Sequence, residues 1–235
     1  MKKHLITLVV FLVPLFLFAQ KNDQPYQYPM AKGSAAWDNL KTYKEKRDAS
    51  QIPQQVVQDL TTSALLESVL NYPLLTDVMV FNSLQEGMDK LKTYFTAFNA
   101  LLQRSDLPAV CIARYRKMPV DSVKFITPLI EKGGYSFRLN FMEMLLAQPE
   151  LQSKLVVSDQ KKLLQQLISN YDAKEKDPEV YGGVALSVTA WPAYHLSRRI
   201  SGNNKKQAGA GLDEGIIADQ ASWKSVITNA RAISR

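Results

Sequence analysis

The chain has 235 residues, of which 29 are Lys or Arg and 22 are Asp or Glu, so its formal net charge is +7 at pH 7. This charge excess is mild for the length and makes no case for a nucleic-acid-binding protein. With 46% hydrophobic residues, the composition excludes the disordered and collagen-like classes, and the presence of only one long apolar run excludes a multi-span membrane protein.

Residues 1–19 have the pattern of a secretory signal peptide. A positive start, Met1–His4, precedes an apolar run, Leu5–Phe18, which Ala19 closes. The run is shorter than the ~20 residues that a membrane-spanning helix needs, and its order of segments is typical of a cleaved signal. We therefore expect cleavage before Gln20 and an exported protein, periplasmic or extracellular, without a transmembrane segment in the mature chain. An uncleaved anchor is the alternative.

The rest of the chain divides into three parts by composition. Residues 20–33 contain two Pro and no hydrophobic periodicity, which predicts an extended linker that Tyr26 and Tyr28 hold against the body. Residues 34–200 are expected to form a helical domain. Residues 201–235 are expected to form a flexible loop, rich in Gly and Asn, followed by a C-terminal helix.

The helical domain is predicted from apolar spacing and from caps. The clearest helix is expected over 84–102, where Ser83 and Glu86 form a capping box. Apolar residues follow at alternating steps of four and three, which predicts one buried stripe: Leu84, Met88, Leu91, Phe95, Phe98 and Leu102. Because no segment reads convincingly as a strand, we expect an all-α fold, a multi-helix array of short amphipathic helices.

Two glycine pairs raise the question of architecture. Gly133-Gly134 is expected to end a helix that contains Leu129 and Ile130, and Gly182-Gly183 to open another helix, kinked at Pro192. The offset between the two pairs is close to that of helical repeats, so the array is either a small α-solenoid or a compact helical bundle.

The sequence offers little for catalysis. His195 is the only histidine and Cys111 the only cysteine of the mature chain, so neither a paired-histidine metal motif nor an internal disulfide can form. We therefore assign no catalytic residue, metal site or cofactor. The rival hypothesis is a hydrolase of envelope polymers that uses two carboxylates, for which Glu143, or Glu67 with Asp77, are candidates.

One segment combines aromatic side chains with positive charge, without an acidic residue near its cations. Aromatic faces stack on sugars, and fixed cations attract anionic groups. An anionic glycan, a lipid head group or an acidic envelope protein would suit such a surface, and a solvated helix end is the alternative. The candidate ligand-binding residues are Trp191, Tyr194, His195, Arg198, Arg199, Lys205 and Lys206.

A family resemblance rests on three short stretches of the sequence. They are Leu70-Asn71-Tyr72-Pro73-Leu74-Leu75, Phe81-Asn82 with Leu84-Gln85-Glu86-Gly87, and Leu101-Leu102 with Arg104 and Asp106. Residues 26–118 thereby resemble the helical N-terminal region of uncharacterised exported proteins of Bacteroidota and some Gram-positive bacteria. The resemblance implies a helical fold. Some members carry a Cys-His-Ser-Tyr-Ala-Trp motif of papain-like type, which this chain lacks, so the resemblance brings no functional residue with it.

These observations predict an exported helical protein of the cell envelope that acts as a binding or interaction module rather than an enzyme. Its expected partners are an envelope protein or an anionic glycan. The alternatives are the carboxylate-dependent hydrolase and a structural spacer in an envelope assembly.

Overall fold

The structure is a computed structural model that describes residues 21–202, 211–216 and 220–234. The predicted signal peptide, Gln20, Lys205 and Lys206 lie outside the described residues. The described part of the chain is all-α, as expected, and none of its helices is long and apolar enough to cross a membrane. Its elements in chain order are α1 Ala35–Asp38, α2 Tyr43–Ala49, α3 Gln54–Asp59, α4 Thr62–Leu70, η1 Leu75–Val80, α5 Leu84–Tyr94, α6 Thr96–Gln103, α7 Leu107–Arg116, η2 Val120–Phe125, α8 Leu129–Leu146, α9 Pro149–Gln152, α10 Val157–Glu175, α11 Pro178–Ile200 and α12 Gln220–Ser234.

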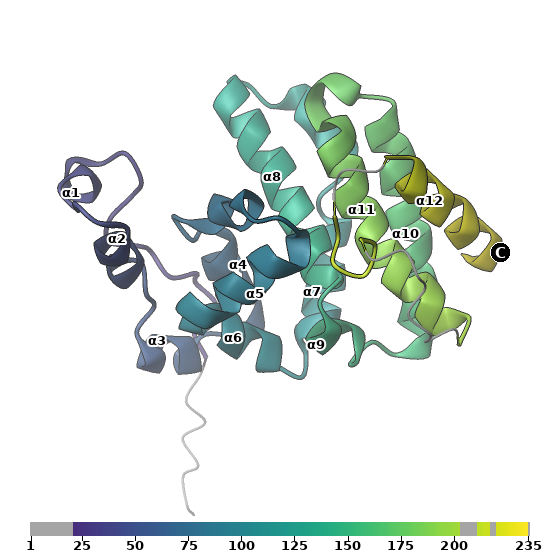
Figure 1. Cartoon of the computed structure of the whole chain (residues 1–235). Helices are drawn as coiled ribbons and strands as arrows, with labels where there is room; N and C mark the ends of the chain where they lie inside the picture. The colour runs from purple at the N-terminus through teal and green to yellow at the C-terminus, as the bar shows by residue number, and fades with distance from the viewer. Residues whose placement is uncertain (1–20, 203–210, 217–219, 235) are drawn as a thin grey trace, which may run out of the picture.

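Helix α11 is the centre of the C-terminal half. It packs against α8, α10 and α12, and Figure 1 shows α8, α10 and α11 standing side by side while α1 and α2 project at the far side of the molecule. Because three helices enclose α11, this half has the packing of a helical bundle. The C-terminal helix α12 shares the core of the helical domain, since Trp223 and Ala230 are buried in the same cluster as Trp37.

The extended N-terminal arm is held as expected. The Tyr26 amide donates to the Ser68 hydroxyl at 2.8 Å, and the Tyr28 hydroxyl donates to the Ser68 carbonyl at 3.0 Å. Asn22 adds an isolated parallel bridge to Leu60. One residue of α4 therefore anchors both tyrosines.

The prediction of one helix over 84–102 is wrong in one respect, because the structure has two helices there, α5 and α6. Its six apolar residues are all buried, and Ser83 caps α5 by accepting from the Glu86 amide at 3.1 Å. At Phe95, however, the backbone is extended (φ −120°, ψ 94°). The Phe95 ring stacks on Tyr72 at 4.0 Å, and the Gln51 amide donates to the Tyr94 carbonyl at 2.9 Å. These tertiary contacts replace backbone hydrogen bonds that the break in the helix removes.

The first glycine pair does not have its expected role, whereas the second does. Gly133 and Gly134 lie inside α8, which begins at Leu129, so they end no helix. In α11 the non-helical angles are at Gly182 (φ 52°), a positive φ that glycine adopts without strain, so the helical run to Ile200 opens at the Gly182-Gly183 pair as expected. The kink expected at Pro192 is wrong, because the helical geometry breaks at Gly182 instead. The two pairs therefore differ in backbone conformation, which removes the local likeness that indicated a repeat.

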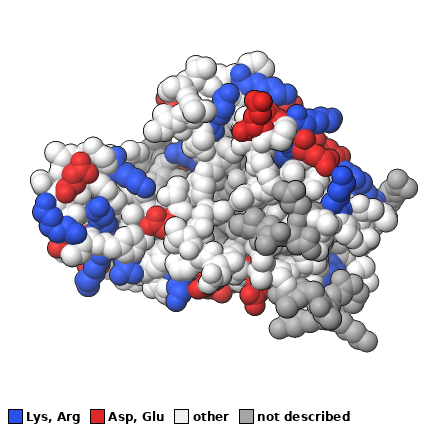
Figure 2. All heavy atoms as spheres, turned by 45° about the horizontal axis from the view of Figure 1, so that its top comes forward, with Lys and Arg blue, Asp and Glu red and all other residues white. Residues whose placement is uncertain are grey.

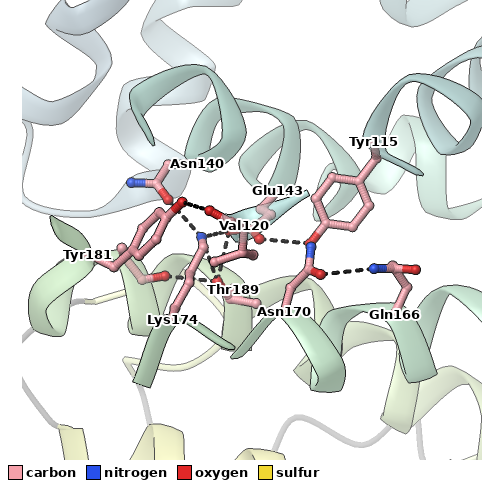
Figure 3. Close-up of polar contacts among 10 residues, drawn as sticks. Tyr115, Val120, Asn140, Glu143, Gln166, Asn170, Lys174, Tyr181 and Thr189 are labelled. Carbon is pink, nitrogen blue, oxygen red and sulfur yellow. Dashed lines mark hydrogen bonds and ion pairs between the residues drawn. The ribbon is translucent and has the colours of Figure 1, made fainter. Parts of the chain in front are cut away.

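A buried polar network joins α7, α8, α10 and α11 around Lys174, whose side chain is 0% exposed. The Lys174 ammonium donates to Asn140 Oδ1 at 2.8 Å, Glu143 Oε2 at 2.7 Å and Thr189 Oγ1 at 2.9 Å (Figure 3). The other Glu143 oxygen accepts from the Tyr115 hydroxyl at 2.7 Å. All three N–H bonds of the ammonium and both oxygens of the carboxylate are thus satisfied, which is what makes a buried ion pair tolerable.

We expect Lys174→Met to destabilise the protein by about 3–5 kcal/mol, because it leaves the Glu143 carboxylate buried without its counter-ion. Urea unfolding followed by helical circular dichroism measures this loss. The double variant Lys174→Met/Glu143→Leu should recover much of it, because both charges are then gone. A single variant as stable as the parent would contradict the role of the ion pair.

Candidate functional site

Five of the predicted binding residues, Trp191, Tyr194, His195, Arg198 and Arg199, lie on the last turns of α11, where the described segment 211–216 crosses them. Trp191 is 0% exposed, and its indole Nε1 donates to the Asp213 carbonyl at 3.3 Å. A Cβ at Gly215 would lie 3.0 Å from the Trp191 ring, so glycine is what allows the segment to pass this close. Segment 211–216 therefore packs against the Trp191 ring, which is not open to a ligand in this arrangement.

Tyr194 and Arg198 are tied to Asp213. The Arg198 guanidinium forms an ion pair with the Asp213 carboxylate at 2.5 Å and lies over the Tyr194 ring at 5.2 Å. The Tyr194 hydroxyl donates to the same carboxylate at 3.2 Å. Burial, and then the nearby Asp213 charge, raise the pKa of Tyr194. Much of the positive charge of Arg198 is therefore balanced within the chain, and the pair fastens segment 211–216 to α11.

His195 packs edge-on against Trp191 and Tyr194, with ring centroids 5.8 and 5.3 Å away. Burial is the main cause that lowers the pKa of His195 to about 4; the Asp213 charge opposes this shift and the Arg198 charge adds to it. The imidazole is therefore neutral at pH 7 and adds no charge to the surface.

Arg199 is the exposed cation of the group. Its guanidinium makes one hydrogen bond at 3.5 Å, to the Ser153 carbonyl, and no carboxylate of the described residues pairs with it. Its positive charge is thus available to a ligand, which distinguishes it from the adjacent Arg198.

Two hollows flank the end of α11 and share Arg198. One has a volume of about 380 Å³, and His195, Arg198, Arg199 and Gln152 are among its lining residues. The other has a volume of about 410 Å³ and lies between α11 and α12, with Tyr194, Ser197, Arg198 and Asn229 in its lining. The structure thus brings four of the seven predicted residues to cavity walls, leaves Trp191 in the core, and does not describe Lys205 and Lys206.

One lining residue of each hollow also has a buried polar atom that finds no hydrogen-bond partner among the described residues. In the Arg199 hollow, by which we mean the 380 Å³ cavity, this is Gln152 Oε1, whose own Nε2 is held by the Leu146 carbonyl at 2.6 Å. In the other hollow it is the Ser197 hydroxyl. Unpartnered buried polar atoms are uncommon and mark places where a water or ligand group would bind. No sequence signal pointed to Gln152, Ser197 or Asp213, because the hollows form only where the segments around 152, 197 and 213 meet in the fold.

The acids proposed for a hydrolase are all engaged elsewhere. Glu143 is buried in the Lys174 network, Glu67 pairs with Arg114, and Asp77 accepts from the Tyr43 hydroxyl. A further hollow of about 550 Å³ does have acids in its lining, among them Glu86 and Asp89. In the described ranges, no three His, Cys, Asp or Glu side chains gather closely enough to hold a metal ion. Cys111 is buried, and burial raises the pKa of its thiol, so it is not an activated nucleophile.

No known protein family, curated protein or solved structure matches the chain.

The depressed pKa of His195 predicts acid sensitivity. Unfolded histidine titrates near 6.5 and folded His195 near 4, so the unfolded chain binds more protons between these values and stability falls as pH decreases through them. Between pH 7 and pH 4.5 the loss from this residue is about 2 kcal/mol. Urea unfolding at both pH values should show a smaller loss for His195→Gln than for the parent chain. Equal losses would mean that the histidine is not buried as described.

Proposed function

We propose that the protein is an exported helical module of the cell envelope that binds an anionic partner at the Arg199 hollow. The observation that carries the proposal is the exposed Arg199 guanidinium at a cavity wall, which pairs with no carboxylate in the part of the chain that the structure describes. A guanidinium of this kind favours carboxylate or phosphate groups, which it binds through charge-assisted hydrogen bonds, whereas the neighbouring Arg198 is already paired with Asp213.

The remaining wall refines the chemistry of the partner. The Gln152 Oε1 acceptor lacks a donor, and the neutral imidazole of His195 can donate one. A ligand with hydroxyl groups beside its negative charge would satisfy both kinds of group. An anionic glycan, in which carboxylates and hydroxyls alternate, has this combination, and it is the partner that we favour over an acidic protein segment.

Export is the second part of the proposal and is supported by the sequence alone. The charged start, the apolar run Leu5–Phe18 and Ala19 favour a cleaved signal, and the resemblance of residues 26–118 to exported helical proteins points the same way. An anionic envelope polymer would be present in the compartment that such a protein reaches.

The test is a single charge reversal, Arg199→Glu. Arg198 is unsuitable, because its reversal would face Asp213 and loosen segment 211–216. Titration calorimetry with polygalacturonate, an anionic glycan, should show binding that weakens with salt and falls at least tenfold in Arg199→Glu, a difference of about 1.4 kcal/mol. Affinity capture from an envelope extract at low and high salt extends the same comparison to protein partners.

Arg116→Glu is the matched control, since Arg116 is an exposed arginine at the end of α7, away from the hollow. It changes the net charge by the same amount and should leave binding unchanged. If both variants lose binding equally, the attraction is a general effect of charge. If Arg199→Glu binds as well as the parent chain, or neither assay detects a partner, the proposed site is wrong and hydrolase assays on envelope polymers become the next step.

A further inference from the structure

The other end of α11 borders an exposed apolar surface. Phe125 at the end of η2 is 87% exposed, and Leu129 and Ile130 in the first turn of α8 are 81% and 82% exposed. The sequence predicts a helix that contains Leu129 and Ile130, and both side chains lie in the first turn of α8. Burying one such side chain is worth about 1.5–3 kcal/mol, so three together favour association with another surface.

A hollow lies beside these side chains. It has a volume of about 240 Å³ between α8 and α11 and is lined on its apolar side by Leu129, Gly133, Phe137 and Val180. It is large enough for one aromatic side chain. The same end of the molecule therefore presents an exposed Phe125 and, a few residues further along the chain, a recess with an apolar side and with Lys132, Ser136, Asn140 and Glu179 as its polar lining.

Two glycines of α8 have no explanation within the chain. A Cβ at Gly133 or Gly134 would meet no atom within 4 Å, and both residues keep helical geometry. Glycine in a helix costs about 1 kcal/mol relative to alanine, so neither conformation nor internal packing accounts for the pair. Glycine does permit the close approach of another chain to the helix backbone.

The charges around this surface are of both signs. Glu131 and Lys132 adjoin Ile130, Glu179 lines the hollow, and Lys124 pairs with Asp121 next to Phe125. Figure 2, which turns this end of the molecule forward, shows acidic and basic side chains next to each other beside uncharged surface. A second copy of the chain can supply charges opposite to these, with Lys132 of one copy facing Glu131 or Glu179 of the other, because a two-fold interface pairs the patch with itself.

We propose that two copies of this protein associate through this surface, with Phe125 of each copy in the α8–α11 hollow of the other. The exposed Phe125, the hollow between α8 and α11 and charges of both signs all belong to one patch, as a two-fold interface requires. The interface is independent of the Arg199 hollow, which lies roughly 25 Å away along α11 at 1.5 Å per residue.

Sedimentation velocity of the purified protein over a wide range of concentration tests the proposal. The parent chain should show a monomer–dimer equilibrium, and Phe125→Ser should raise the dissociation constant at least tenfold. Gly133→Leu should do the same by filling the space that the partner backbone occupies, although it is accommodated in the monomer. Both variants should keep the parent's helical circular dichroism, which shows that they fold.

Val157→Ser is the matched control, because Val157 is 82% exposed at the start of α10 and belongs to no part of the patch. It should dimerise like the parent chain. A monomeric parent at every concentration, or an equal effect of Val157→Ser, would overturn the proposal. Co-sedimentation of the parent with phosphatidylglycerol vesicles, lost in Phe125→Ser while the parent stays monomeric, would identify a membrane as the occupant instead and equally overturn it.

Discussion

The C-terminal half of this protein depends on one ammonium group that must stay charged away from water. Taking Lys174 into the interior costs several kcal/mol unless acceptors surround it. Asn140 and Glu143 of α8 and Thr189 of α11 supply three, at distances of 2.7–2.9 Å. Only one axial position of each helix brings these atoms together, so the network defines how α8, α10 and α11 lie against each other, and Tyr115 extends the same constraint to α7.

With α11 held in this way, its two ends become surfaces of different character. At the C-terminal end, Asp213 pairs with Arg198 and accepts a hydrogen bond from Tyr194, and these contacts hold segment 211–216 against α11. Arg199 pairs with no carboxylate of the described residues, so its charge is available to a ligand. The chemical type of a side chain thus does not decide its role. A guanidinium with a carboxylate partner holds the chain together, whereas its neighbour one residue further on can recognise a ligand.

The proposed binding and self-association surfaces reinforce each other. A dimer formed through the start of α8 would place the two Arg199 hollows away from the interface, both open to solvent. A polymeric glycan with repeated carboxylates could then occupy both hollows at once, and the second contact would form at a high effective concentration. Two weak sites would then be enough to hold the protein on such a polymer. This suits a hollow in which Arg199 is the cation that pairs with no carboxylate of the described residues.

The sequence by itself determined the class of fold and many helix starts, because caps and apolar spacing act within about four residues. Ser83 caps α5 as expected, and the stripe that follows is buried. Only the tertiary structure decided where that stripe breaks, since Gln51 bonds the Tyr94 carbonyl from 43 residues away and Tyr72 stacks on Phe95 from 23 residues away. It likewise decided that Leu129 is exposed and that Asp213 engages Arg198. Burial and charge pairing depend on contacts between side chains that are distant in the sequence, and the local spacing of residues does not determine those contacts.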